Sequence, residues 1–227
     1  MIREIVPTKD GSLTIAVPEM NATYHSVYGA IRESRHVFIE AGLNTAESVG
    51  QPDTISIFEM GFGTGLNALL TLIEAEKTQQ KIYYTAIDLY PLSLEETREL
   101  NYCELLHRSD LKQLFYKFHG DWEKEDEITP FFSLSKYSKS LLDFKTEKRY
   151  HLIYFDAFAP ASQPELWTAE VFEGMYTMLH PGGLLVTYCS KGDVRRAMIK
   201  SGFTVEKIPG PPGKREIVRA RKEVYGF

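Results

Sequence analysis

The sequence has little cysteine and no metal-binding spacing. Cys103 and Cys189 are the only cysteines among its 227 residues, too few for a disulfide framework, and neither belongs to a CxxC or Cys/His pattern. The six histidines show no metal spacing either, and we interpret His36 and Glu40, at i and i+4, as a surface pair. These absences favour a reducing compartment, so we expect a cytoplasmic protein without a bound metal.

The chain also lacks segments that would target it to a membrane. Its first residues, MIREIVPTKDG, carry charges and a proline where a signal peptide needs an apolar core. The strongest apolar run, GGLLVTYC, has the length of a strand and falls far short of the roughly 18 residues of a spanning helix. With 43% hydrophobic and 25% charged residues, the composition is that of a soluble globular protein. We expect one domain over residues 1–227.

The net charge of −5 is unevenly distributed. Ten Lys or Arg but only three Asp or Glu lie between Lys191 and Lys222, so this stretch carries +7 and the rest of the chain −12. One interpretation is a solvated helix face beside a charged edge strand. The other is a local patch for a polyanion. Charge alone leaves both open.

From residue 54 onward, apolar runs of strand length alternate with helix-like runs, which is typical of an α/β fold with a parallel sheet covered on both faces. A capping box is expected at Ser93 and Glu96. Residues 1–53 are expected to form an N-terminal extension, a small hairpin and helix on the sheet or over its mouth, before a core at 54–222. Residues 122–149 are either a lid or a helical crossover. The expected strands are 55–60, 81–88, 114–121, 151–158 and 184–189, with helices at 65–77, from 93 towards 107, at 164–179 and at 193–201, and a closing hairpin of FTVEKI and REIVRARK.

A glycine cluster lies where the first core strand turns into a helix, the position at which open α/β sheets bind nucleotides. Gly61, Gly63 and Gly65 let the backbone approach a ligand and adopt positive φ. A GxGxxG dinucleotide fingerprint would need a small residue at position 66, and this chain has Leu66. Glu59 would repel a pyrophosphate but attract the sulfonium and ammonium groups of S-adenosylmethionine (SAM). SAM is therefore the predicted cofactor.

Two further acids support this prediction. Asp88 ends the expected second strand, where it can accept hydrogen bonds from ribose hydroxyls, and Asp121 ends the expected third strand, where it can reach the adenine amine. Both could instead be loop-capping aspartates. Acids at the ends of three consecutive strands favour a SAM site over that interpretation.

Five segments follow one another in the order and spacing of a known family: GFGTGLNALL, IDLYPLS, FDAFAPASQPELWT, SKGDVRRAMIKSGF and PGKREI. The chain resembles the methyltransferase domain of MnmC, the bacterial enzyme that completes 5-methylaminomethyl-2-thiouridine at the tRNA wobble position. The likeness covers roughly residues 24–220 and corresponds to a stand-alone form without the FAD-dependent oxidase domain of bifunctional members. It implies a Rossmann-like class I SAM-dependent methyltransferase fold, with a mostly parallel seven-stranded sheet and an antiparallel closing hairpin.

The resemblance also implies roles for side chains near the substrate. Asp156 would face the methyl group and the acceptor amine. Phe158 would form a dry wall and stack on the uracil, or it is instead a core aromatic. Trp167 is expected to pack in the helical core. The implied contacts with tRNA are Lys214 and Arg215, with Arg195 and Arg196 behind them.

The implied reaction is attack of a primary amine on the SAM methyl group, and only the neutral amine has a free lone pair. A carboxylate with a pKa of about 3.9 is a poor base for an ammonium with a pKa of about 10.4, so Asp156 is interpreted as an acceptor that orients the amine. Two alternatives stay open. One is a small-molecule amine N-methyltransferase or aminopropyltransferase of the same fold; the other is a catalytically silent module that binds tRNA or protein.

Overall fold

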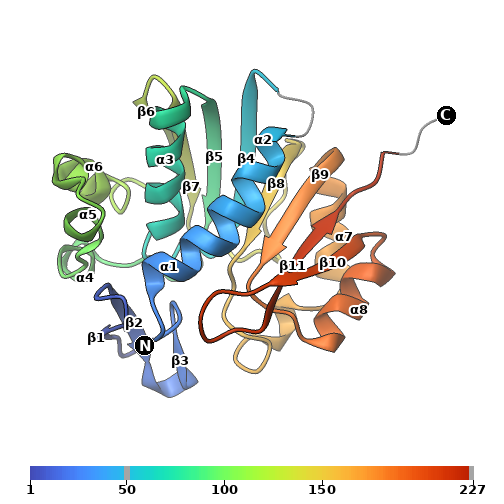
Figure 1. Cartoon of the computed structure of the whole chain (residues 1–227), viewed down its shortest axis with the longest axis horizontal. Coiled ribbons are helices and arrows are strands. Elements are labelled where there is room, and N and C mark those ends of the chain that lie inside the picture. Colours follow the sequence, from blue (N-terminus) through green and yellow to red (C-terminus); the bar gives the residue numbers. More distant parts are fainter. Residues whose placement is uncertain (49–51, 225–227) are drawn as a thin grey trace.

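The computed structural model describes residues 1–48 and 52–224, and its centre is one β-sheet (Figure 1). Among the described residues eight strands form this sheet, one more than the seven expected. They are β4 (Thr54–Met60), β5 (Lys81–Ile87), β6 (Lys124–Thr129), β7 (Phe132–Tyr137), β8 (Tyr150–Phe155), β9 (Leu179–Thr187), β10 (Thr204–Pro209) and β11 (Glu216–Arg221).

The strands pair in the order β10-β11-β9-β8-β4-β5-β7-β6. The five central strands, from β9 to β7, are mutually parallel. β11 runs antiparallel to β9, β10 antiparallel to β11, and β6 antiparallel to β7. The predicted mostly parallel sheet and its closing hairpin of β10 and β11 are therefore confirmed.

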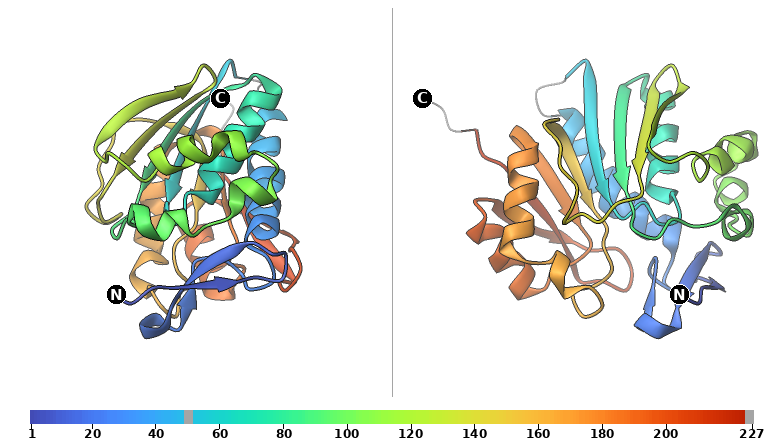
Figure 2. Two further views of the ribbon diagram at one scale, coloured as in Figure 1. Left: turned by 90° about the vertical axis from the view of Figure 1, so that its left-hand side faces the viewer. Right: turned by 180° about the vertical axis from the view of Figure 1, so that it is seen from behind.

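Helices pack on both faces of the sheet (Figures 1 and 2). One face is covered by α3 (Leu66–Thr78) and a continuous N-terminal helical segment, and the other by two helices from the second half of the chain. Each face has its own apolar cluster, one around Phe38 and Leu69 and the other around Phe155 and Phe172. The N-terminal segment comprises α1 (Ala30–Ser34), the π-helical η2 (Arg35–Leu43) and α2 (Asn44–Ser48), and the opposite helices are α7 (Ala169–Met178) and α8 (Gly192–Lys200).

The second face is not covered along its whole width, as the view from behind shows (Figure 2). α7 and α8 lie over the half of the sheet with β8 to β11. Over β5 and β7 the described residues place no helix, and the strands there alternate between apolar and polar side chains. Phe132 and Leu134 are buried in the core, whereas Ser133 lies on the other face and Tyr83 is 52% exposed. The sheet is thus covered on both faces over only part of its width.

A separate three-stranded antiparallel sheet precedes the helical segment and lies near the carboxyl ends of the parallel strands (Figure 1). Its strands are β1 (Glu4–Pro7), β2 (Leu13–Val17) and β3 (Ala22–Thr23), with the short helix η1 (Pro18–Met20) between the last two. The expected small hairpin and helix at residues 1–53 are present as this sheet with α1, η2 and α2.

The prediction of a strand at 114–121 is wrong. These residues belong to α6 (Lys112–Lys117) and the turn after it, and the third parallel strand of the core is β7. Residues 122–149 are accordingly neither a lid nor a helical crossover, because they contain the β6–β7 hairpin and a loop. Asp121 lies in the turn between α6 and β6 and is exposed. It does not end a strand of the sheet.

Several helix boundaries also differ from expectation. The capping box at Ser93 and Glu96 is confirmed, but α4 (Leu94–Arg98) ends early and is followed by α5 (Tyr102–Leu105) and η3 (Ser109–Leu111). The helix expected at 164–179 is divided into η4 (Pro164–Leu166) and α7. The HPGG segment that was expected to stop this helix lies inside β9, which begins directly after α7.

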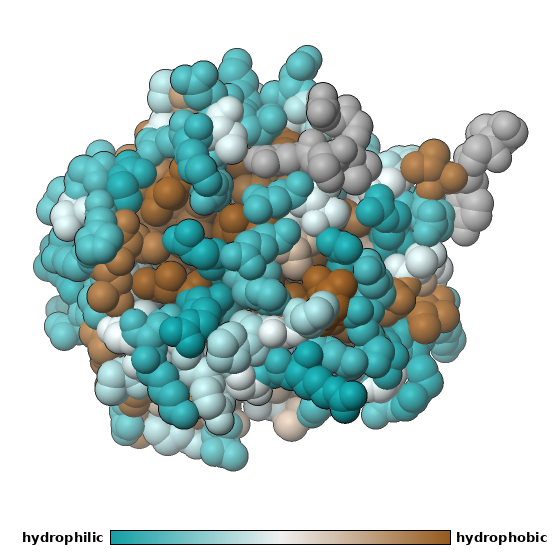
Figure 3. Space-filling model, in the orientation of Figure 1, coloured by the Kyte–Doolittle hydropathy of each residue, from teal (hydrophilic) through white to brown (hydrophobic). Residues whose placement is uncertain are grey.

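The surface in the view of Figure 1 is mostly hydrophilic, with apolar side chains in small separate patches (Figure 3). Within the described residues, no helix is both long and apolar enough to cross a membrane.

Candidate active site

A cavity of about 390 Å³ lies at the carboxyl ends of the central parallel strands. This is the end of an open α/β sheet at which ligands bind, and the volume lies in the usual range of small-molecule sites. Its walls come from five parts of the chain. They are the N-terminal residues 23–28 with Glu33, the glycine turn with Asn67, residues 88–90, residues 156–159 with Gln163, and Tyr188 with Gly213 and Lys214.

The glycine turn between β4 and α3 forms the floor of the cavity. Gly61, Gly63 and Gly65 all have positive φ, at 89°, 50° and 72°. A Cβ atom at Gly61 would lie 2.5 Å from the backbone carbonyl oxygen of Asp156, so only glycine allows the ends of β4 and β8 to come this close. The backbone of this turn is therefore open to a ligand above it, which fits the cofactor predicted from the sequence.

Asp88 follows β5 directly and holds the glycine turn. Its Oδ2 accepts a hydrogen bond from the backbone N–H of Gly63, and its Oδ1 accepts one from Tyr90, both at 2.8 Å. Burial raises the pKa of Asp88, although these two hydrogen bonds oppose the shift. Each carboxylate oxygen can accept a second hydrogen bond, so Asp88 can bind ribose hydroxyls while it holds the turn.

Asp156 follows β8 and shares a hydrogen-bond donor with Glu59. The side-chain amide of Asn67, in the first turns of α3, donates to Asp156 Oδ2 and to Glu59 Oε1, each at 2.9 Å. Burial raises the pKa of Asp156 to about 7, and the nearby Glu33 carboxylate adds to the shift. The Asn67 hydrogen bond and the Lys214 ammonium act in the opposite direction. Asp156 is therefore half ionised near neutral pH, which suits a proton acceptor.

Glu33 and Lys214 form an ion pair in the cavity wall. Lys214 Nζ lies 2.7 Å from Glu33 Oε1, and the two side chains are 26% and 9% exposed. The same ammonium lies 4.2 Å from the centre of the Tyr188 ring, whose hydroxyl donates to the Ala157 carbonyl oxygen at 2.8 Å. Lys214 thus links the closing hairpin to α1 across the cavity.

The N-terminal segment closes the cavity from the side. The Tyr24 ring packs edge-on against Phe158, with 5.1 Å between ring centroids. Buried His25 lies between Thr14 and Thr64, with its Nδ1 3.1 Å from the Thr14 hydroxyl. Burial lowers the pKa of His25 to about 4, so this side chain is neutral at pH 7.

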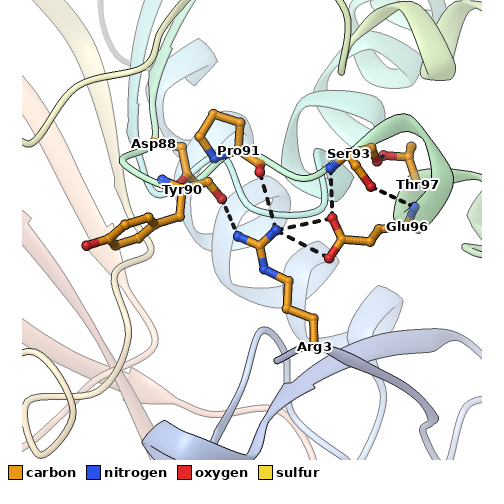
Figure 4. A network of polar contacts seen from close by, with 7 residues as sticks. All are labelled: Arg3, Asp88, Tyr90, Pro91, Ser93, Glu96 and Thr97. Atoms are coloured by element: carbon orange, nitrogen blue, oxygen red, sulfur yellow. Dashed lines mark hydrogen bonds and ion pairs between the residues drawn. The ribbon is translucent and has the colours of Figure 1, made fainter. Parts of the chain in front are cut away.

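Arg3, just before β1, fixes the N-terminal sheet to the segment after β5 (Figure 4). Its Nη2 donates to the Tyr90 carbonyl oxygen at 2.6 Å, and its Nη1 donates to that of Pro91 at 3.3 Å. Nη1 also lies 3.1 Å from Glu96 Oε2, and this carboxylate in turn caps α4. The fork of the guanidinium thus fixes the segment that begins at Asp88.

The sequence-predicted residues divide into three groups. The cavity is lined by Gly61, Gly63, Asp88, Asp156, Phe158 and Lys214. Glu59 is fully buried behind Asn67, and Gly65 caps α3 beneath the cavity. The third group does not belong to the described residues that line the cavity, and it comprises Asp121, Arg195, Arg196 and Arg215.

Some predictions about individual side chains can be compared directly with the structure. Trp167 is 6% exposed and packs in the core, as expected, and its Nε1 donates to the Phe158 carbonyl oxygen at 2.8 Å. His36 and Glu40 form the expected pair, with 3.1 Å between their side chains. Both cysteines are free and buried. In the described part of the chain, no cluster of three potential metal ligands occurs.

Sequence reasoning missed Asn67, Glu33, Tyr24, His25 and Tyr188. Asn67 lies in the expected helix at 65–77, to which the sequence assigns no functional residue beyond Gly65. A polar residue at position 67, between Leu66 and the apolar run that follows, was the signal available for it. The other four lie in the N-terminal extension or just after β9, and only the tertiary fold brings them to the cavity.

The chain is similar in sequence to known proteins. A family model described as S-adenosyl-L-methionine-dependent methyltransferase matches residues 136–223. The tRNA 5-methylaminomethyl-2-thiouridine biosynthesis bifunctional protein MnmC of Paraburkholderia xenovorans is 25% identical over 220 residues, which cover 90% of this chain and 33% of that protein. The protein of the same name from Cupriavidus metallidurans is 29% identical over 218 residues, with coverage of 90% and 32%. The chain spans about a third of the length of these relatives.

Solved structures show the same fold. MnmC2 from Aquifex aeolicus superimposes with a TM-score of 0.79 at 24% identity, covering 98% of this chain and 71% of that one. Spermidine synthase from Thermotoga maritima superimposes with a TM-score of 0.57 at 15% identity, with coverage of 97% and 68%. The predicted class I methyltransferase fold is therefore confirmed, and the predicted cofactor, SAM, is that of the matching family.

Proposed function

We propose that this chain methylates the 5-aminomethyl group of the tRNA wobble (2-thio)uridine to give 5-methylaminomethyl, as its similarity to a SAM-dependent methyltransferase family and to MnmC suggests. The observation that carries the proposal is Asp156, a carboxylate with a pKa raised to about 7 in a cavity beside the glycine turn. An amine acceptor needs a group that binds its ammonium form and takes up one proton. Asp156 has both properties.

The cavity residues fit the cofactor. The glycine turn exposes backbone at its floor, and Asp88 retains acceptor capacity for ribose hydroxyls. When bound, SAM supplies an electrophilic methyl group on its sulfonium. Lys214, Phe158 and Tyr24 line the cavity, and the Tyr24 ring packs against Phe158. Adenine recognition by Asp121 finds no support, since this residue is exposed after α6.

The environment of Asp156 changes the interpretation reached from the sequence. An aspartate with a pKa of about 3.9 would oppose proton transfer from an ammonium of about 10.4 by some 9 kcal/mol. With a pKa of about 7 for Asp156, the difference falls to about 5 kcal/mol. Asp156 Oδ2 already accepts a hydrogen bond from Asn67, so we expect Oδ1 to bind the ammonium and accept its proton. The carboxylate thus both orients the amine and serves as its base.

The test compares acceptors directly. Purified protein is incubated with SAM and with total tRNA from cells that lack the gene, with total tRNA from wild-type cells, or with small amines including polyamines. We expect methyl transfer to the first tRNA pool, with nucleoside mass spectrometry showing conversion of 5-aminomethyl to 5-methylaminomethyl uridine. Transfer only to a small amine would favour the alternative acceptor class, and no SAM consumption with any acceptor would favour the silent module. Either result would overturn the proposal.

A further inference from the structure

Glu59, Asn67 and Asp156 form a hydrogen-bonded row of side chains, in which the Asn67 amide is the donor to both carboxyl groups. Both oxygens that accept from Asn67 lie 2.9 Å from the same nitrogen, so they are at most twice that distance apart. Glu59 is fully buried, and its Oε2 has no hydrogen-bond partner among the described residues. Within that part of the chain, no cation forms an ion pair with either carboxylate. Two ionised carboxylates this close, without a paired cation, repel each other strongly.

The orientation of the Asn67 amide follows from this arrangement. With its NH₂ group towards the carboxylates, each N–H has an acceptor. A flipped amide would place Oδ1 against the acceptor oxygen of the ionised Asp156 and lose that hydrogen bond. Asn67 Oδ1 is buried and has no partner among the described residues, so the contacts of the NH₂ group with Glu59 and Asp156 set the orientation of this amide.

We propose that Glu59 is an uncharged acid that orients Asn67, and that Asn67 in turn positions the Asp156 carboxylate, so that Glu59 and Asn67 are positioning residues and Glu59 is not a ligand of SAM. The inference deepens the proposed function, because the role of Asp156 rests on it. A neutral Glu59 still accepts from Asn67 through Oε1. Its proton lies on Oε2, the oxygen that has no hydrogen-bond partner among the described residues.

The groups around the two acids support this distribution of charge. Burial raises the pKa of Glu59 well above its usual value, and Asp156 and Asp88 add to the shift, whereas the Asn67 amide and the Tyr84 hydroxyl oppose it. Asp156 faces Glu33 from α1, Lys214 from the β10–β11 connection and Tyr188 after β9. Lys214 is nearest to Glu33, to which it is paired, so it does not neutralise Glu59. The proton shared by the two acids therefore resides on the more deeply buried one.

Carboxyl-carbon NMR of the full chain tests the proposal without any acceptor. Protein labelled with [4-¹³C]aspartate is titrated, and the Asp156 signal is assigned by its loss in Asp156→Asn. We expect its midpoint to stay within about 0.3 pH units in Glu59→Gln, because a neutral amide replaces a neutral acid of the same shape. If Glu59 were ionised, removal of its charge would lower the midpoint by about one unit or more. That shift would overturn the proposal.

Asn67→Ala gives the complementary result. Loss of a hydrogen bond that favours the carboxylate should raise the Asp156 midpoint by about one unit, from the usual worth of a bond to a charged group. Asn44→Ala, at an exposed asparagine in the same part of the fold, is the matched control and should leave the midpoint unchanged. An unchanged midpoint in Asn67→Ala would remove Asn67 from its positioning role.

Two further measurements complete the test. Calorimetric titration with SAM should give the same affinity for Glu59→Gln and wild type, and a loss of tenfold or more would make the Glu59 carboxylate a SAM ligand and overturn the proposal. Wild-type protein labelled with [5-¹³C]glutamate should show one buried carboxyl signal that keeps its protonated shift at pH 7. Absence of such a signal would overturn the proposal even if the variants failed to fold. If the NMR results hold but tRNA is not methylated, the function proposed above fails and the charge assignment stands.

Discussion

At the scale of single residues, burial decides what Asp156 can do. Its position directly after β8 places it in the cavity, where few solvent molecules can stabilise its charge. Glu33 increases the cost of ionisation, while Asn67 and Lys214 reduce it. The carboxyl pKa of about 7 is the balance of these effects.

The pH profile of kcat/KM follows from this balance. The ionised form of Asp156 accepts the proton, and its fraction increases as the pH rises through about 7, so activity should rise over the same interval. Asp156→Asn should lose this limb and about 10²-fold or more in kcat. Both effects are measured by steady-state kinetics at intervals of about half a pH unit between roughly pH 5.5 and 9. Asp143→Asn, at an exposed aspartate, is the control, and a limb that persists in Asp156→Asn would contradict the assignment.

Gly61 is the position where a single methyl group should have the largest effect on the cavity. In Gly61→Ala the new Cβ would lie 2.5 Å from a backbone oxygen at a φ of 89°, so β4 and β8 must move apart. We expect SAM affinity to fall tenfold or more in calorimetric titration, with a lower melting temperature. At Gly63 an added Cβ would lie 2.9 Å from the Tyr24 ring, so the clash there is with a side chain and not with the backbone.

Gly174→Ala is the matched control for Gly61→Ala. This glycine lies inside α7 with nothing within 4 Å of an added Cβ, so the substitution should stabilise the helix by about 0.5–1 kcal/mol and leave SAM affinity unchanged. Equal SAM affinity in both variants would exclude the glycine turn from the site.

The residues that could be predicted from the sequence are those fixed by local chain geometry. Gly61, Asp88 and Asp156 follow strands directly, and parallel strands bring their carboxyl ends to one edge. Glu59 was placed on the cofactor because its position relative to the glycines is also local, but the side chain points into the core. Glu33 reaches the cavity only through the packing of α1, which no local pattern encodes.

At the scale of elements, the segment from α6 to β7 shows where periodicity stops being informative. LFYKFHGD has apolar residues at spacings that fit both a strand and a short helix, and α6 is only six residues long. The first four residues of FSLSKY alternate between apolar and polar, as in a half-buried strand, with Phe132 and Leu134 inward and Ser133 and Ser135 on the other face. The alternating pattern was the better strand signal. The third parallel strand could have been assigned from it.

Arg3 joins two elements, the N-terminal sheet and the segment that starts at Asp88 (Figure 4). Arg3→Ala should free both parts and weaken SAM binding several-fold, because Asp88 holds the glycine turn. Arg3→Lys should rescue little of the loss, since an ammonium cannot reproduce the planar fork.

SAM calorimetry, together with limited proteolysis of the N-terminal sheet, measures this loss. Arg98→Ala removes an exposed arginine from α4, the helix that Glu96 caps, and should behave as wild type. If Arg3→Ala bound SAM normally while its N-terminus was cleaved faster, the sheet would be attached to the cavity without supporting it.

At the scale of the whole molecule, ion pairs within the fold use much of the excess positive charge at residues 191–222. Lys207 pairs with Glu216 and Arg219 with Glu206, both at 2.9 Å, and Arg196 pairs with Asp193. Lys222 donates to two backbone carbonyl oxygens. The sequence left open a solvated charged edge or a patch for a polyanion. The ion pairs fit the charged edge, and exposed cations such as Arg215 are available to a polyanion.

The structure separates the roles of Lys214 and Arg215, which sequence analysis assigned together to tRNA. If Arg196 and Arg215 each neutralise a phosphate, Arg196→Ala with Arg215→Ala should make the slope of log K against log salt shallower by about 1.5, at roughly 0.7–0.9 per contact. Both side chains are exposed, and Arg215 forms no ion pair among the described residues. Lys214→Ala should leave the slope unchanged, but it should lower the melting temperature, because Glu33 would remain buried without its partner.

Filter binding of tRNA across a salt series, with a melting curve for each variant, distinguishes these outcomes. Lys77→Ala with Lys81→Ala removes two exposed cations at the end of α3 and the start of β5, on the side opposite the cavity, and is the matched control. Its slope should equal that of wild type. An equal slope in the folded Arg196/Arg215 double variant would mean that tRNA does not approach over α8 and the closing hairpin. A shallower slope in Lys214→Ala would mean that its ammonium leaves Glu33 to meet a phosphate, so that the ion pair in the cavity wall opens when tRNA binds.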